Sequence, residues 1–377
     1  MVEQNRLVQE FISLVQVDSE SKFETEISKV LTQKFSELGL KVEEDDSASK
    51  IGHGAGNLIC TLDATDNSSF IPELLFTSHM DTVAPGKAIK PQIGDDGYIR
   101  SDGTTILGSD DKAGIAVMFE AIRILKEQNI PHGQIQFIIT VGEEVGLKGS
   151  RSMDPKWITA QYGFALDSNG SIGDIATAAP GRAEIAITFQ GKSAHAGVNP
   201  EDGISAIQVA SKAVSKMTLG RIDSETTANI GSFSGIGPLN VVCDKVTLEA
   251  EARSIVQPKL EKQIESMRQA CETAAKEAGT TCEFNSEIVY VSYMHDDSSP
   301  VVQLASRAMK TMGLTSRTFH SGGGSDANIF NGLGVPTVNL AVGYNEIHTT
   351  KENIAISDLV KTAELVVAII KESTKGL

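Results

Sequence analysis

The sequence predicts an α/β protein with a mixed sheet that is interrupted by a smaller inserted domain, and three observations lead to this fold class. Strand-like and helix-like segments alternate along the first part of the chain, which favours a mixed α/β sheet. Between residues 183 and 290 the order becomes strand, helix, two strands, helix and strand, which is typical of a ferredoxin-like βαββαβ domain. The α/β pattern then resumes from about Pro300. One α/β domain carrying an insertion is the simplest explanation.

The elements of the outer α/β domain are expected from the spacing of apolar residues. Apolar side chains recur with helical spacing in the segments 3–16, 25–38, 112–128, 300–312 and 357–373. Shorter β-rich runs predict strands at 57–62, 74–78, 134–141, 162–166 and 336–341. Because the strand at 74–78 opens with three apolar residues in a row, we expect it to lie inside a sheet covered on both faces.

The inserted domain is expected to span residues 179–291, so that the outer domain comprises residues 1–178 and 292–377. A stretch of small residues at 176–181 precedes it and is a candidate hinge. The predicted inserted elements are strands at 183–190, 226–234, 239–252 and 281–290, with helices at 202–217 and 258–278.

Length and charge limit the possible partners. A chain of 377 residues suits two domains. Its 33 basic and 49 acidic residues give a formal net charge of −16, which disfavours binding to nucleic acid or to an anionic membrane. The first residues have an amphipathic helix pattern rather than that of a secretory signal, and the four cysteines show no metal-type spacing. We therefore expect a cytoplasmic protein with reduced cysteines and no membrane partner.

His79 and Asp81 directly follow the predicted strand at 74–78. Side chains at the carboxyl end of such a strand face the crevice in which α/β proteins bind ligands. A histidine beside a carboxylate suits either a metal ligand with its orienting partner or a catalytic acid–base pair. The alternative is a capping aspartate beside a solvent-exposed histidine.

Carboxylates occur at two further element boundaries. Asp110 opens the helix at 112–128, where it is either an N-cap that contributes about 1 kcal/mol or a metal ligand kept ionised by the helix terminus. Glu143 and Glu144 follow the strand at 134–141 between glycines. Adjacent carboxylates repel each other, and a metal would supply the counter-charge, so that one could be a ligand and the other a general base. The alternative is a charged surface turn.

The remaining candidates are weaker one by one. Asp167 ends the strand at 162–166, and His348 lies in a loop after the strand at 336–341. The turn at 321–324 contains Gly323 and could bind an anion through backbone N–H groups, but it lacks a nucleotide P-loop pattern and could be only a flexible connection. Taken together, two histidines, two aspartates and a glutamate without cysteine suit a catalytic zinc pair better than a structural zinc.

The order of these motifs, from His79 to His348, resembles that of the peptidase T, carboxypeptidase G and aminoacylase family of di-zinc hydrolases. The most specific segments are SHMDT, GSDDKAG, GEEVGLKGS, SAHAGVNPEDG and IHTTKENI. The segment LDSNG followed by GDI is most similar to the peptidase T branch, which removes the N-terminal residue from tripeptides.

The resemblance implies a role for each matching residue. His79, Asp110 and Asp167 would hold one Zn²⁺, and Asp110, Glu144 and His348 would hold a second, although Co²⁺ or Mn²⁺ could replace zinc. Asp81 would orient His79, and Glu143 would be the general base. The inserted domain would be a lid and dimerisation domain. The residues that would bind the substrate are His195, Asn240, Arg253 and Gly323.

The function that follows is hydrolysis of short peptides by a di-zinc exopeptidase, with a homodimer through the lid. A carboxypeptidase or an N-acyl amino acid amidohydrolase would use the same zinc site. A non-catalytic binding protein on this fold would be expected to lack a ligand or the base, and every one of these residues is present. A magnesium-dependent phosphotransferase would need neither histidine ligand and would require a phosphate loop.

Overall fold

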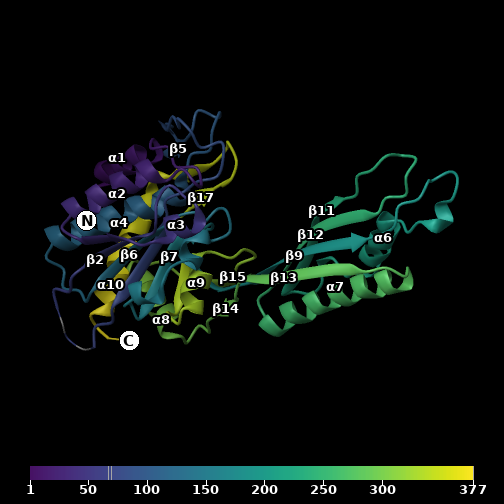
Figure 1. Cartoon of the computed structure of the whole chain (residues 1–377). Helices are drawn as coiled ribbons and strands as arrows, with labels where there is room; N and C mark the ends of the chain where they lie inside the picture. The colour runs from purple at the N-terminus through teal and green to yellow at the C-terminus, as the bar shows by residue number, and fades with distance from the viewer. Residues whose placement is uncertain (67, 69, 377) are drawn as a thin grey trace. The chain divides into compact units, whose positions relative to one another are not determined.

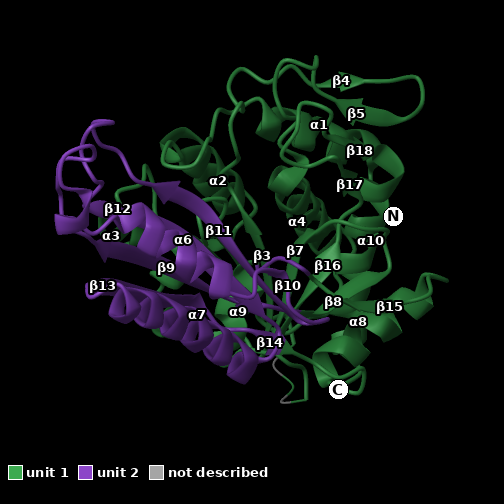
Figure 2. Cartoon of the chain, turned by 90° about the vertical axis from the view of Figure 1, so that its right-hand side faces the viewer, with its two compact units in different colours: residues 1–178, 294–321, 325–377 green, residues 179–293, 322–324 purple. Residues whose placement is uncertain are grey.

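The structure is a computed structural model that describes residues 1–66, 68 and 70–376. The chain divides into two compact units, coloured separately in Figure 2. Unit 1 comprises residues 1–178, 294–321 and 325–377, and unit 2 comprises residues 179–293 and 322–324. Residues 292 and 293 and the turn at 322–324 therefore group with unit 2, whereas they were predicted from the sequence to belong to the outer domain.

Unit 1 is built on a mixed sheet, as expected for the fold class. The strand order is β1-β2-β6-β3-β7-β16-β8-β14, and β15 also pairs with β8. The central strands β6, β3, β7 and β16 run parallel to one another, whereas β2 pairs antiparallel with β1 and β6, and β8 pairs antiparallel with β16. The strands of this sheet are β1 (Lys41–Glu44), β2 (Leu58–Leu62), β3 (Leu74–His79), β6 (Ile135–Thr140), β7 (Tyr162–Ser168), β8 (Asp174–Ala179), β14 (Tyr293–Met294), β15 (Arg317–His320) and β16 (Thr337–Ala341).

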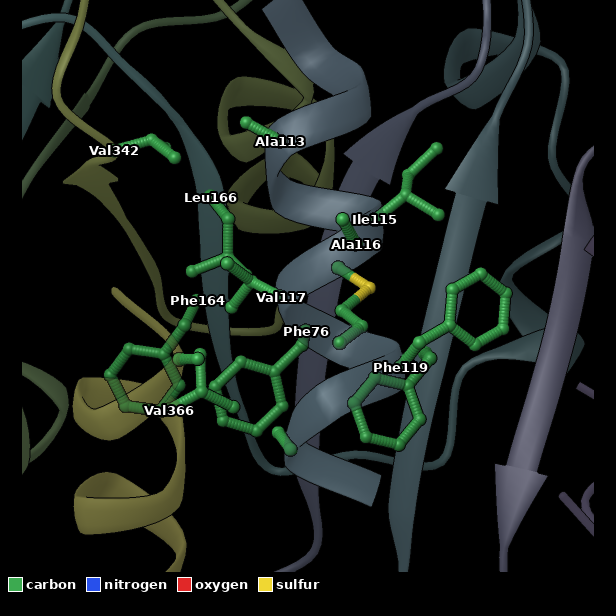
Figure 3. Close-up of a cluster of buried hydrophobic side chains, with 14 of the residues drawn as sticks. Phe76, Ala113, Ile115, Ala116, Val117, Phe119, Phe164, Leu166, Val342 and Val366 are labelled. Atoms are coloured by element: carbon green, nitrogen blue, oxygen red, sulfur yellow. The ribbon is translucent and has the colours of Figure 1, made fainter. Parts of the chain in front are cut away.

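Helices cover both faces of this sheet. Strand β3 is buried at every position, with Phe76 in the cluster that includes helix α4 and Leu75 in the cluster that includes helix α9. Figure 3 shows part of the α4 cluster, with Phe76, Phe119 and Phe164. The helices of unit 1 are α1 (Gln4–Val15), α2 (Thr25–Glu37), α3 (Ser47–Ile51), α4 (Ser109–Glu127), α5 (Lys148–Arg151), η1 (Pro155–Trp157), α8 (Pro300–Thr311), α9 (Asp326–Gly332) and α10 (Ile356–Ser373), labelled in part in Figure 1.

A second, small sheet of unit 1 has the order β17-β18-β5-β4. Its strands are β4 (Gln92–Ile93), β5 (Tyr98–Arg100), β17 (Tyr344–Asn345) and β18 (Asn353–Ala355). Because β17 and β18 pair antiparallel, they fix both ends of the loop that carries His348.

Unit 2 has the expected βαββαβ order with one addition, the two-residue strand β10 before β11, and it has its own hydrophobic cluster. Its antiparallel sheet has the order β10-β11-β12-β9-β13. The elements of unit 2 are β9 (Gly181–Gln190), η2 (Pro200–Asp202), α6 (Ala206–Lys216), β10 (Gly220–Arg221), β11 (Thr226–Ser234), β12 (Lys245–Ser254), α7 (Gln257–Glu277) and β13 (Cys282–Tyr290).

The candidate hinge at 176–181 is largely strand β8, and the division between the two units falls within it, after residue 178. One predicted strand differs from the structure. The strand expected from residue 239 begins only at Lys245. The apolar residues near 239–242 imitate a strand pattern, but Val242 N donates to the carbonyl oxygen of Ala194 in a loop rather than to the sheet. In the described part of the chain, every helix is too short or too polar to cross a membrane.

Candidate metal centre

Three parallel strands bring the first candidate residues to one edge of the sheet. Strand β3 ends at His79, β6 ends shortly before Glu143, and β7 carries Asp167 near its end. Because β3 is parallel to both β6 and β7, the carboxyl ends of all three meet at the same edge, which is where α/β sheets bind ligands.

Asp110 lies between two histidines. Its Oδ1 is 3.0 Å from His79 Nε2, and its Oδ2 is 3.2 Å from His348 Nε2. Its carboxylate is thus directed at the two imidazoles rather than serving as a helix cap, which was the alternative for this residue.

One further carboxylate lies beside each histidine. Asp167 Oδ1 is 3.7 Å from His79 Nε2, and Glu144 Oε1 is 3.1 Å from His348 Nε2. Asp110 therefore joins a His79–Asp167 pair to a His348–Glu144 pair. The structure brings all five predicted ligands into one cluster of unit 1.

The donor set fits divalent cations. Two groups could hold an ion with ligand atoms within 4.8 Å of one another: one is His79, Asp110 and Glu144, and the other is His79, Asp111 and Asp167. Nitrogen and oxygen donors without a thiolate are typical of catalytic zinc sites. Asp111 was not among the predicted ligands, although it neighbours Asp110 in the sequence.

Electrostatics also favour a cation at this position. Burial and the nearby carboxyl groups of Asp110 and Asp326 together raise the pKa of Asp167 to about 7, with His79 opposing the rise. Burial likewise raises the pKa of Glu144. Crowded, desolvated carboxyl groups resist ionisation unless a positive charge compensates them. A metal ion would supply that charge and keep the carboxylates ionised.

Asp81 contacts both His79 and the Glu143–Glu144 turn. His79 Nδ1 lies 3.0 Å from the backbone carbonyl oxygen of Asp81 and donates to it, which leaves Nε2 free to act as a ligand. The Asp81 carboxylate is 3.6 Å from His79 Nδ1 and accepts hydrogen bonds from Ser21 Oγ (2.6 Å) and from the backbone N–H groups of Glu143 (3.0 Å) and Glu144 (3.3 Å). Asp81 thus ties the N-terminal segment and the Glu143–Glu144 turn to the end of β3.

Glu143 lies outside both groups that could hold an ion. Its pKa is raised well above the ordinary value, first by burial and then by the carboxyl groups of Asp167, Asp326 and Glu144, with His79 opposing. A raised pKa brings a carboxyl group closer to the value useful for proton transfer near neutral pH.

The predicted substrate-binding residues belong to unit 2. His195 and Asn240 lie in exposed loops that are joined to each other, because Ala196 N donates to the carbonyl oxygen of Asn240 at 2.9 Å. Arg253 pairs with Glu251 on the same strand, with Nε 3.0 Å from Oε1.

The glycine turn that contains Gly323 also groups with unit 2. A Cβ atom built on Gly324 would lie 2.4 Å from the ring of Tyr290, so a larger residue at that position would require this ring to move.

Some residues around the cluster escaped the sequence analysis. Ser21 donates to Asp81, the Tyr344 hydroxyl donates to Asp167 Oδ1 at 3.1 Å, and the buried Glu352 accepts from Asp110 N at 3.0 Å. Glu352 belongs to the segment IHTTKENI, but its partners lie far away in the sequence. Among the residues that were not predicted, only Asp111 could have been suspected from the local sequence, because it neighbours Asp110.

A mixed α/β sheet with an inserted βαββαβ unit, and a buried carboxylate shared by two histidines, define a hydrolase of the kind that uses divalent cations. Comparison with known proteins is more specific. The family model described as peptidase family M20/M25/M40 matches residues 75–372. The chain therefore belongs to this peptidase family, and the resemblance expected from its motifs is confirmed.

Several known proteins resemble the whole chain. The crystal structure of aminopeptidase PepT from Bacillus cereus is 59% identical, with a TM-score of 0.94 and coverage of 99% of both chains. The structure of a tripeptidase from Staphylococcus aureus is 46% identical, with a TM-score of 0.95 and full coverage of both chains. The Bacillus subtilis protein YqjE is 56% identical over 375 residues, with 100% of both chains covered.

Proposed function

We propose that the protein is a dinuclear zinc aminopeptidase that releases the N-terminal residue of tripeptides. The observation that carries this proposal is Asp110, whose two carboxylate oxygens face two different histidines 3.0 and 3.2 Å away. The similar aminopeptidase and tripeptidase structures support the direction of cleavage and the peptide length. The proposed ligands are His79, Asp110 and Asp167 for one ion, and Asp110, Glu144 and His348 for the other.

The proposed reaction is attack of water on the first peptide bond. When bound, two divalent cations polarise the scissile carbonyl group and lower the pKa of water. Glu143 accepts a proton from the attacking water as the new C–O bond forms. It then gives this proton to the nitrogen of the leaving amine as the C–N bond breaks. Asp81 holds the backbone of Glu143 in place through the hydrogen bond at 3.0 Å.

Unit 2 is proposed to recognise the substrate. His195, Asn240, Arg253 and Gly323 are the proposed contacts. Burial lowers the pKa of Arg253, but the hydrogen bond with Glu251 prevails and raises it, so the guanidinium stays cationic despite its burial. A cationic guanidinium suits the C-terminal carboxylate of a short peptide.

The test is product analysis with a matched peptide set, together with measurement of zinc content. Tripeptides with both ends free should lose their first residue, and acetylation of the N-terminus should stop hydrolysis, whereas amidation of the C-terminus should only weaken it. Release of the C-terminal residue would favour the carboxypeptidase alternative, and faster cleavage of the acetylated substrates would favour an amidohydrolase. A zinc-loaded protein that cleaves none of them would favour a binding protein.

Two further properties belong to this proposal. We propose a cytoplasmic enzyme, supported by four free cysteines among the described residues. We also propose a homodimer through unit 2, supported by the long edge strand β13 (Cys282–Tyr290), which can pair with another chain. Light scattering should then give twice the chain mass of 40.1 kDa, and a monomeric mass would contradict the dimer.

A further inference from the structure

Glu352 is a buried carboxylate that receives four hydrogen bonds from one short segment. Glu352 is 1% exposed. Oε2 accepts from the backbone N–H groups of Leu107 (2.8 Å) and Gly108 (2.9 Å). Oε1 accepts from Ser109 Oγ (2.6 Å) and from the backbone N–H of Asp110 (3.0 Å). Both oxygens are therefore used twice, which is the full capacity of a carboxylate.

These four donors lie directly before the side chain that the two proposed ions would share. Gly108 has a φ of +76°, in the left-handed region that favours glycine, and Asp110 and Asp111 depart from helical geometry at the start of α4. The segment 107–110 thus lacks a regular helical hydrogen-bond pattern of its own. The carboxylate of Glu352 accepts the hydrogen bonds of this segment instead. The bond that it accepts from Asp110 N fixes the backbone of Asp110.

Glu352 also belongs to the segment that carries His348. Its backbone N–H donates to the carbonyl oxygen of Thr349 at 3.2 Å, and strand β18 begins at the next residue. His348 has a φ of +62°, an uncommon backbone conformation for a residue other than glycine, which the surrounding structure must maintain. A single side chain therefore connects the backbone of one proposed ligand to the loop of another.

From this geometry we infer that Glu352 is a positioning residue that sets the separation of Asp110 and His348 and thereby the affinity of the centre for divalent cations. The inference rests on the proposed function, because it concerns the ligands proposed there. Glu352 contacts neither imidazole in the hydrogen bonds described above, so its effect is transmitted through the backbone of residues 107–110 and 348–352.

The test is Zn²⁺ titration of the full-length protein, by competition with a chromophoric chelator, for wild type and Glu352→Gln. The glutamine side chain keeps the shape but presents an NH₂ group to two donors in place of an acceptor oxygen. Loss of a partner that orients metal ligands typically weakens metal affinity about 10- to 100-fold, and we expect a loss of this size. The rise in melting temperature on adding Zn²⁺ should shrink in parallel.

Glu120→Gln is the matched control. Glu120 is also a fully buried carboxylate, and it accepts from Glu3 N (2.9 Å), Arg6 Nε (2.7 Å) and Arg6 Nη2 (2.9 Å), but it has no contact with the proposed ligands. This substitution should lower the melting temperature with and without Zn²⁺ while leaving the Zn²⁺ affinity unchanged. An equal loss of affinity in both variants would show a general loss of structure and would overturn the inference.

Ser109→Ala keeps the inference testable if Glu352→Gln does not fold. It removes one of the four donors and retains the carboxylate, so Zn²⁺ affinity should fall in the same direction by a smaller factor. Wild-type Zn²⁺ affinity in Glu352→Gln, or in Ser109→Ala where the first variant is unfolded, would overturn the inference. The Zn²⁺ titration uses no substrate, so it is independent of turnover. A wild type that binds Zn²⁺ but leaves tripeptides intact would therefore refute the proposed function and leave the inference about Glu352 standing.

Discussion

Asp110 uses its two carboxylate oxygens for different partners. A monodentate ligand would need only one oxygen near one imidazole, but here each oxygen has its own histidine. Burial opposes ionisation of this carboxyl group, yet the hydrogen bonds with His348 and His79 prevail and lower its pKa. An oriented, readily ionised carboxylate between two imidazoles is suited to bridging two cations.

The role proposed for Glu143 leads to a prediction about turnover. Glu143→Gln should lower kcat by about 10²- to 10⁴-fold, the range typical of a lost general base, because the amide cannot accept the proton. Zinc content should stay at the wild-type value, since Glu143 is not one of the five proposed ligands. Steady-state kinetics and metal analysis of one preparation measure both quantities.

Glu37→Gln is a suitable control for this substitution, because Glu37 is an exposed carboxylate on α2. It should retain wild-type kcat. Activity of Glu143→Gln within tenfold of wild type would refute the base assignment, and loss of zinc would mean that Glu143 is itself a ligand.

Single residues were most readily predicted from the sequence where an element boundary marked them. His79 and Asp167 end strands, and Asp110 begins a helix, so their local patterns were visible. Glu352 could not be found in this way, because its partners lie as far as 245 residues away in the sequence. Its role depends on tertiary structure, which no short pattern encodes.

At the scale of elements, stacked phenylalanine rings between the main sheet and α4 stabilise β3, the strand that ends at His79. Phe76 is fully buried, and its ring centroid is 5.9 Å from that of Phe137 and 5.5 Å from that of Phe164. Phe76→Ala should lower the free energy of unfolding by about 3–5 kcal/mol, because it removes a large buried side chain and leaves a cavity. Chemical denaturation of the metal-free protein would measure this change.

Phe70→Ala provides the comparison for the core substitution. Phe70 is 59% exposed, so its removal should change the free energy of unfolding by no more than about 0.5 kcal/mol. Similar losses in the two variants would contradict the buried packing of Phe76 described here.

The parallel pair of β8 and β15 leads to a pH-dependent prediction. Asp174 and Arg317 are cross-strand partners, with Nε 2.8 Å from Oδ1 and Nη2 2.6 Å from Oδ2. The hydrogen bonds from Arg317 lower the pKa of Asp174, so this pair stabilises the fold above the pKa of an unfolded aspartate, about 3.9, and the contribution is lost as pH falls. Arg317→Ala should therefore be less stable than wild type at pH 7.

The same comparison at low pH provides the check. At a pH well below the lowered pKa of folded Asp174, the melting temperatures of wild type and Arg317→Ala should converge, because protonated Asp174 no longer forms the ion pair. A difference that is the same at pH 7 and at low pH would mean that Arg317 acts through packing and not through charge.

Long elements were predictable and short ones were not. The five long helices of unit 1 (α1, α2, α4, α8 and α10) and the four main strands of unit 2 carry enough apolar residues to show their period. The strands β4, β14 and β17 have two residues each, too few for any periodicity, and β8 consists largely of small residues. The loop before β12 was wrongly predicted to be part of a strand. Its apolar residues are exposed, and the sequence pattern does not distinguish them from the buried apolar residues of a strand.

On the scale of the whole molecule, all five proposed ligands belong to unit 1, whereas unit 2 has a separate hydrophobic cluster. Removing metal with a chelator should therefore lower the melting temperature of unit 1 and leave that of unit 2 unchanged. At a free metal concentration about 1,000 times the Kd, the stabilisation lost is about 4 kcal/mol.

Differential scanning calorimetry with EDTA and with Zn²⁺ would resolve the two transitions. A single transition that moves as a whole would contradict independent unfolding of the two units, and no movement at all would contradict a metal centre.

The division of unit 1 by the insertion has a consequence for biosynthesis. Asp110, Glu144 and Asp167 precede unit 2 in the sequence, but His348 and Glu352 follow it. During translation, unit 2 can fold while the final strand and helix of unit 1 are still unmade. The nascent chain cannot form the proposed second metal position until the segment that follows unit 2 has been made. The proposed peptidase activity would therefore be absent while unit 2 is being synthesised and would arise only after unit 1 has been completed around it.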